Sequence, residues 1–248
     1  MKIAIAGGTG VVGRHVVTAA SAAGHEPVVL SRSAGADLLT AEGLDGRLAG
    51  VGAVIDVSST PSLSSKAAAR FFGTVTDNLI AAERTAGVPH HVVLSIIGAT
   101  KAPSGHYAGK AVQEQKVMNS GDGWSILRTT QFHEFARQTT ERLAFGGVQL
   151  VPAMRCQPIA AAEVAADLVR IAEGPPSGLA TDLAGPREEE MAELVRRYLK
   201  ATGKTKPVLR LILPGRFGRA LRDGGLLPGP GARLGTQTFD QWLALQRT

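Results

Sequence analysis

Apolar runs that suit buried strands alternate, from the first residue onward, with segments whose apolar residues recur at helical spacing. This alternation predicts an α/β fold of Rossmann type, a doubly wound parallel sheet wrapped by helices. The short, glycine-rich stretch 33–52 predicts a poorly formed or missing strand, at most a stub at Ala36–Leu39. The expected strands are Lys2–Ala6, Pro27–Ser31, Ala53–Val57, His91–Ser95 and Trp124–Arg128, and the expected helices are Val11–Ala23, Ser64–Ala86, Tyr107–Asn119 and Phe132–Phe145.

The pattern changes after Gly146. Residues 224–235 hold five glycines and two prolines, which favours a mobile loop or a lid. We therefore expect a core of residues 1–150, on which helix 161–173 packs, and a small C-terminal region, 174–248, that covers a substrate. The elements expected after Gly146 are helix Ala161–Glu173, strand-like run Leu179–Leu183, helix Glu188–Lys200, strand Val208–Leu213 and helix Phe239–Leu245.

Three glycines lie between the first expected strand and the first expected helix. In dinucleotide-binding turns, Gly7 would let the chain reverse, Gly10 would let the backbone approach a pyrophosphate, and Gly13 would let the helix pack on the strand. Free amides at the helix start, over Gly10, Val11 and Val12, would face the phosphates. The alternative is a tight structural turn. We predict dinucleotide binding.

The end of the second strand bears on which dinucleotide binds. A carboxylate there would hold the adenosine ribose and repel a 2′-phosphate, but this chain has Ser31, Arg32 and Ser33. A guanidinium between two hydroxyls suits a ribose phosphate. We therefore predict NADP(H) rather than NAD(H). The alternatives are that Arg32 stacks on adenine or points to water; Asp37 is a further candidate for an adenine contact.

Side chains suited to hydride-transfer chemistry follow the fourth strand. Ser95 ends that strand, and His106, Tyr107 and Lys110 open the next helix. Strand ends at the carboxyl edge of a parallel sheet converge on a ligand crevice. There Lys110 would hold a ribose and favour ionisation of a phenol, while Ser95 would orient a carbonyl.

These motifs resemble the atypical short-chain dehydrogenase/reductases, the NmrA-like NAD(P)-binding group. The resemblance rests on Gly7–Gly13, on Arg32, Ser95 and Lys110, and on the runs Trp124–Phe135, Gln157–Ala165 and Leu183–Pro186. It implies a Rossmann core with a small C-terminal substrate region. It also implies cofactor contacts from Thr9, Gly10, Val12, Arg32, Val57, Ser58 and Lys110.

One position departs from the group's pattern. The Tyr-x-x-x-Lys motif places a tyrosine four residues before the lysine, where this chain has His106, and Tyr107 lies three residues before Lys110. Both offsets reach one helix face. Either Tyr107 stands in once the helix has begun, or His106 donates the proton, or the acid is lost and cofactor binding alone remains.

Phe132 and His133 follow the fifth strand and are candidates for a substrate pocket. Together these features predict an NADPH-dependent reductase of a small, largely apolar carbonyl, quinone, imine or activated alkene. The alternative is a nucleotide-binding redox sensor without turnover. His90 and His91 precede a strand, and we interpret them as surface residues rather than metal ligands, so no metal site is expected.

Composition limits the remaining classes. The chain has 248 residues, 44% of them hydrophobic, and a net charge of +6. Nine Lys or Arg and no Asp or Glu lie between Arg196 and Arg222, yet aromatic residues make up only 4% of the chain, which disfavours nucleic-acid binding. One cysteine, no signal-peptide pattern and no apolar run near the roughly 18 residues of a membrane span predict a soluble cytoplasmic protein. The oligomeric state stays open.

Overall fold

The computed structural model describes residues 1–121 and 123–246. The chain forms two compact units, and each is described by itself. The first unit contains Met1–Arg128 and Ala162–Thr181, and the second contains Thr129–Ala161 and Asp182–Thr248.

The first unit is built on a sheet of strand order β5-β4-β3-β1-β2, with the short β9 beside β5. The pairings of β1 with β2, β1 with β3, β3 with β4 and β5 with β9 are parallel. These strands are β1 (Lys2–Ala6), β2 (Glu26–Leu30), β3 (Val51–Asp56), β4 (His91–Ile96), β5 (Trp124–Thr129) and β9 (Gly178–Leu179).

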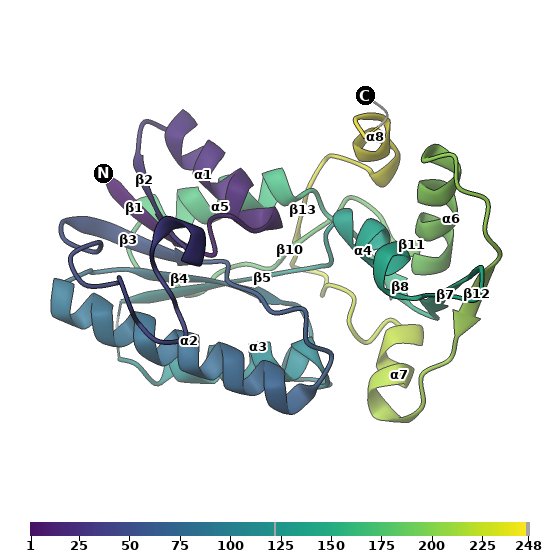
Figure 1. Ribbon diagram of the computed structural model, residues 1–248, viewed down its shortest axis with the longest axis horizontal. Helices are drawn as coiled ribbons and strands as arrows, with labels where there is room; N and C mark the ends of the chain where they lie inside the picture. Colours follow the sequence, from purple (N-terminus) through teal and green to yellow (C-terminus); the bar gives the residue numbers. More distant parts are fainter. Residues whose placement is uncertain (122, 247–248) are drawn as a thin grey trace. The chain divides into compact units, whose positions relative to one another are not determined.

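Helices cover both faces of this sheet. In Figure 1, α1 and α5 lie on one face and α2 and α3 on the other. Strands with both faces covered need apolar residues at nearly every position, and Ile3, Ala4, Ile5 and Ala6 of β1 are fully buried. The helices are α1 (Val11–Ala22), α2 (Ser65–Ala86), α3 (His106–Met118) and α5 (Ala161–Glu173). This doubly wound, mostly parallel arrangement confirms the predicted Rossmann-type fold.

The stretch between β2 and β3 forms no strand. It contains a short 3₁₀ helix, η1 (Arg32–Ala34), followed by turns. Glycines with positive φ, at Gly35, Gly43, Gly46 and Gly50, interrupt it, and three of its four leucines, Leu38, Leu44 and Leu48, are buried in the core. Here glycine-rich chain packs onto the core through single leucines instead of pairing as a strand.

The second unit contains a small sheet of strand order β12-β7-β6, against which α4 and α6 pack. The unit also contains two pairs of short strands, β8 with β11 and β10 with β13. The elements are α4 (Glu134–Arg142), β6 (Ala144–Phe145), β7 (Val148–Pro152), β8 (Arg155–Cys156), β10 (Leu183–Ala184), β11 (Glu189–Glu190), α6 (Met191–Ala201), β12 (Val208–Leu211), α7 (Gly215–Arg222), β13 (Arg233–Leu234) and α8 (Phe239–Ala244).

Two sequence-based expectations differ from this arrangement. The second unit includes residues 129–150, which the sequence assigned to the core, because β7 pairs with β12 and α4 packs against α6. The expected helix Phe132–Phe145 is shorter, because its last residues, Ala144 and Phe145, pair with β7 as β6.

The prediction that His90 and His91 are surface residues is wrong, because both side chains are buried. The Nδ1 of His91 lies 2.7 Å from the Oε1 of Glu83 on α2, and the Nε2 of His90 lies 2.9 Å from the Oγ of Ser125 on β5. A polar partner inside the core pairs with one ring nitrogen of each imidazole, which hydropathy alone does not reveal. None of the described helices combines the length and apolarity needed to cross a bilayer.

Candidate nucleotide-binding and catalytic site

The turn between β1 and α1 has the geometry that its glycines predict. Gly7 has φ +81°, and a Cβ on it would lie 2.9 Å from the Cα of Ser58. A Cβ on Gly13 would overlap the carbonyl oxygen of Gly7, so this glycine lets α1 approach the turn. Gly10 is the N-cap of α1, and no described side chain caps it. The amides around Val11 and Val12 therefore remain for a ligand.

Ser58 lies directly beside this turn, after β3. Its backbone N–H donates to Oδ1 of Asp56 at 2.8 Å. Its own Oγ is buried and has no hydrogen-bond partner among the described residues. Buried hydroxyls are nearly always paired, so an orphan at this position indicates a missing ligand atom. The cofactor contacts that the resemblance implies for Val57 and Ser58 stay a prediction.

Arg32 opens η1 at the carboxyl end of β2. Its side chain is exposed and forms no ion pair with a described residue, and the hydroxyls of Ser31 and Ser33 lie 3.1 Å apart beside it. An uncommitted guanidinium beside two hydroxyls can bind a phosphate without first breaking a protein contact. Asp37 accepts a hydrogen bond from its own loop, at the N–H of Leu39.

Lys110 lies in the α3–β4 contact, buried beneath the helix. Its Nζ donates to the carbonyl oxygen of Leu94 and to Oε1 of Gln113, both at 2.7 Å, and lies 4.4 Å from the ring centre of Phe72. Burial lowers the pKa of Lys110 to about 8, against the charges of Asp56 and Glu114, which raise it. A lysine pKa lowered by burial is typical of functional sites.

A hydrogen-bonded chain joins Lys110 to the glycine turn. Gln113 accepts from Lys110 and donates from its Nε2 to Oδ2 of Asp56 at 2.7 Å. Asp56 in turn holds the backbone of Ser58, which faces Gly7. The chain is buried, so the glycine turn and the lysine are fixed in one rigid frame.

Ser95 of β4 is held by a carboxylate of α3, the helix that also carries Lys110. Its Oγ donates to Oε1 of Glu114 at 2.6 Å, and Glu114 also receives a two-point contact from Arg128 at 2.9 and 2.6 Å. Glu114 is fully buried, so this arginine neutralises a charge inside the core. The hydroxyl hydrogen of Ser95 must leave Glu114 before it can be donated to a substrate carbonyl.

Helix α3 has already begun at His106, so Tyr107 and Lys110 stand at i and i+3, and His106 and Lys110 at i and i+4. Tyr107 is buried, whereas His106 is partly exposed and lies edge-on against Phe72, 5.2 Å between ring centres. Tyr107 could replace the motif tyrosine only if the helix had already begun at this residue. The structure meets this condition.

Phe132 and His133 belong to the second unit. The backbone of Phe132 bridges Ile159, while Nε2 of His133 lies 3.0 Å from the carbonyl oxygen of Gln237. The His133 ring also packs 5.8 Å from those of Phe239 and Trp242 in α8. These contacts give His133 a packing role within its own unit, and its assignment to a substrate pocket stays a prediction.

The sequence interpretation missed Asp56, Gln113, Glu114 and Arg128. Gln113 and Glu114 follow Lys110 by three and four residues, which puts all three on one face of a helix. Asp56 is a carboxylate inside an otherwise apolar strand. The helical spacing and the carboxylate within an apolar strand are both visible in the sequence. Only the fold shows that these residues contact one another.

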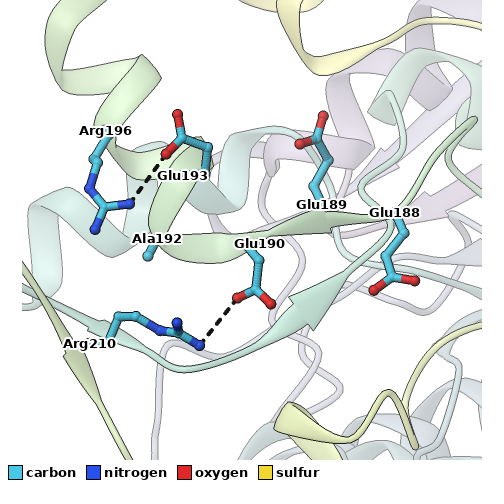
Figure 2. A pocket seen from close by; sticks show the side chains of 7 residues that line it. All are labelled: Glu188, Glu189, Glu190, Ala192, Glu193, Arg196 and Arg210. Atoms are coloured by element: carbon cyan, nitrogen blue, oxygen red, sulfur yellow. Dashed lines mark hydrogen bonds and ion pairs between the residues drawn. The ribbon is translucent and has the colours of Figure 1, made fainter.

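A surface pocket of the second unit carries a different chemistry. Figure 2 shows its lining, in which Arg196 pairs with Glu193 and Arg210 pairs with Glu190. Because these carboxylates are paired with arginines, the pocket is a solvated ion-pair cluster. Among the described residues, no group of three or more His, Cys, Asp or Glu is arranged to hold a metal.

Comparison with known proteins places this geometry among solved structures. No family model matches the sequence, and no curated protein matches it significantly. An NADPH-dependent quinone oxidoreductase from Escherichia coli, in complex with NADPH, superposes with a TM-score of 0.72 at 20% identity, over 99% of this chain and 100% of that one. A UDP-glucose 4-epimerase from Thermus thermophilus, in complex with NAD, gives 0.72 at 18%, over 100% and 98%.

The fold is that of NAD(P)-dependent reductases and epimerases. An NAD-dependent NDP-hexosamine 5,6-dehydratase, TunA, shares it as well, with a TM-score of 0.70 at 19% identity over 98% of this chain and 95% of that one. The likeness covers at least 98% of this chain, so the predicted resemblance is confirmed at the level of the fold.

Proposed function

We propose that this protein is an NADPH-dependent oxidoreductase of the atypical short-chain dehydrogenase/reductase type. The observation that carries the proposal is the buried chain Lys110–Gln113–Asp56–Ser58, which ends against the glycine turn. A nucleotide-binding turn and an amine with a lowered pKa, fixed in one frame, suit a nucleotide-dependent reaction better than a structural role.

The residues present fit the cofactor. The uncapped amides of α1 and the close approach at Gly7, Gly10 and Gly13 would take the pyrophosphate, with Thr9, Val11 and Val12 beside it. Arg32, flanked by Ser31 and Ser33, would take the 2′-phosphate. The orphaned hydroxyl of Ser58, next to Val57, would find its partner on the bound nucleotide.

When bound, NADPH supplies a hydride to an electrophilic carbon or to a quinone. Lys110 is held by Leu94 and Gln113, and its Nζ would favour a negatively charged or phenolate neighbour on α3. One proton must then reach the reduced acceptor to balance the hydride. Tyr107 or His106 would donate it from the first turn of α3, with water as the remaining source.

The substrate we propose is a small, largely apolar carbonyl, quinone, imine or activated alkene. Among the solved structures of this fold, the NADPH-dependent quinone oxidoreductase matches both the cofactor that Arg32 favours and the full length of this chain. In the first unit the pocket would include Ser95 and Tyr107. Phe132 and His133, in the second unit, stay candidates from the sequence alone.

Loss of nicotinamide absorbance, measured with NADPH and a panel of one quinone, one enone, one aldehyde and one imine, tests this function. Lys110→Met should lower kcat/KM on the order of a hundredfold. The matched control is Lys116→Met on the same helix, where the exposed Lys116 pairs with Asp77; it should stay within about twofold of wild type. Tyr107→Phe and His106→Asn in the same assay identify the proton donor. Equal rates for Lys110→Met and wild type would contradict the assignment.

One observation favours the second candidate, a nucleotide-binding redox sensor. Ser95 and Lys110 both donate to acceptors of the protein itself, Glu114 for the serine and Leu94 with Gln113 for the lysine. A sensor would bind NADPH and NADP⁺ with different affinities and turn over none of the acceptors. Sustained turnover of any acceptor would exclude it.

A further inference from the structure

The small sheet of the second unit has one covered face and one uncovered face. Helices α4 and α6 pack against the sheet, and Gln149 and Val151 of β7 point to them and are fully buried. The amide of Gln149 donates to the carbonyl oxygen of Thr139 in α4 at 3.0 Å. Because side chains alternate along a strand, the intervening residues of β7 point to the opposite face.

Every side chain on that opposite face is apolar. Strand pairing aligns Leu209 with Leu150, Leu211 with Pro152 and Phe145 with Val148, so these residues share one side of the sheet. Phe145 is 78% exposed, Leu209 54% and Leu211 41%. Ile212, directly after β12, is 69% exposed. Apolar side chains gathered on one exposed face mark an interaction surface.

Positively charged residues lie in the segments that precede and follow the strands of this apolar face. Lys204 and Lys206 immediately precede β12, Arg142 ends the helix before β6, and Arg216 and Arg219 lie on α7, which follows β12. All five are exposed, and none forms an ion pair with a described residue. The segments that carry them, 142–155 and 196–222, contain no Asp or Glu. These two segments therefore carry charge of a single sign.

We propose that this face, with the cations of these segments, binds the surface of an anionic lipid bilayer. Phe145, Leu209 and Leu211 enter the interfacial region, and Lys204, Lys206, Arg142, Arg216 and Arg219 contact the phosphate and carboxylate headgroups. An apolar insertion alone or a basic patch alone binds a membrane weakly, whereas the two together anchor a protein stably. Attachment is peripheral, since the chain's described helices do not cross a bilayer.

Charge distinguishes this partner from the others that an apolar face could take. A second copy of the chain would bring the five cations of each face toward the same five of the other, and neither segment that carries them supplies a carboxylate. A nucleic acid would engage the cations but leave Phe145 and the leucines in water, because no row of aromatic rings is present for its bases. Anionic lipid offers negative headgroups to the cations and an apolar environment to the exposed apolar side chains.

Sedimentation with vesicles tests the proposal on the full-length protein. Vesicles of phosphatidylcholine alone are compared with vesicles in which about a third of the lipid is phosphatidylserine. Wild type should sediment only with the anionic vesicles. The double variant Lys204→Gln/Lys206→Gln should bind on the order of thirtyfold more weakly, and Phe145→Ser/Leu209→Ser at least roughly tenfold more weakly.

Matched controls lie in the first unit: Leu63→Ser, at an equally exposed leucine, and Lys66→Gln/Lys101→Gln, at exposed lysines, should bind as wild type does. Thermal unfolding of each variant confirms that it folds. Failure of wild type to bind anionic vesicles overturns the proposal. So does a dimer in light scattering that Phe145→Ser/Leu209→Ser dissociates, or binding of duplex DNA that depends on the lysines and not on Phe145.

Discussion

At the scale of single residues, the three glycines of the first turn have different structural roles. Gly13 is irreplaceable for packing, because a Cβ there overlaps the carbonyl oxygen of Gly7 and the backbone of Gly8. A Cβ on Gly10 meets only one atom, the Gly7 oxygen, at 3.1 Å. Gly10 therefore keeps space for a ligand, whereas Gly13 keeps space for the helix.

Substitution by alanine should separate these two roles. Gly13→Ala should lower the free energy of unfolding by roughly 3 kcal/mol or more, because backbone atoms must move apart. Gly10→Ala should cost less than about 1 kcal/mol in stability but weaken NADPH binding on the order of tenfold or more. Urea unfolding and NADPH titration of both variants check this. Equal stability losses would contradict the division of roles.

Residue chemistry also shows where sequence interpretation reached its limit. Gly7, Arg32 and Lys110 were predictable because each lies at a fixed offset from a strand or helix end. The partners of Lys110 were not: Asp56 comes from β3 and Gln113 from α3, fifty-seven positions apart in the chain, and only their hydrogen bond shows that they belong together. Buried polar groups are identified by their partners, which spacing alone does not specify.

At the scale of elements, a buried ion pair joins α2 to β4. Burial by itself would lower the pKa of His91, but the carboxylate of Glu83 at 2.7 Å outweighs it, helped by Asp56, so the pKa is raised. A raised pKa in the folded state gives stability that is fully present below the ordinary histidine value. That stability is lost as the pH rises through the folded value.

The substitution Glu83→Gln should therefore destabilise the protein most near pH 6, by about 2 kcal/mol, and progressively less toward pH 9. The matched control, Asp77→Asn, removes the exposed partner of Lys116 from the same helix. It should cost less than about 1 kcal/mol, with little pH dependence in this range. Denaturant unfolding at several pH values measures both. A pH-independent loss for Glu83→Gln would show that His91 is neutral in the folded protein.

Most element positions of the first unit were predictable, because apolar strands and periodic helices alternate there, except between β2 and β3. The second unit was harder. Its strands are two to five residues long, and Phe145 looks like the end of a helix until β7 is seen to pair with it. Short strands are stabilised by pairing with segments that are distant in the sequence. Their local sequence pattern therefore does not distinguish a strand from a helix.

At the scale of the whole molecule, the two units carry separate properties. The first holds the glycine turn, Arg32 and the Lys110 chain, and the second holds the apolar sheet face and its cations. The proposed NADPH binding therefore depends on side chains that lie within the first unit. Variants of the sheet face, such as Phe145→Ser/Leu209→Ser, leave those side chains unchanged.

Calorimetric titration of NADPH and NADH into wild type, Arg32→Ala and the control Arg70→Ala tests whether the protein prefers NADPH and binds it through Arg32. Arg70 is an exposed arginine on α2. We expect wild type and Arg70→Ala to bind NADPH more tightly than NADH, and Arg32→Ala to lose on the order of tenfold to a hundredfold in NADPH affinity with NADH affinity unchanged. Equal binding of the two nucleotides by wild type, or no effect of Arg32→Ala on NADPH, would contradict the account.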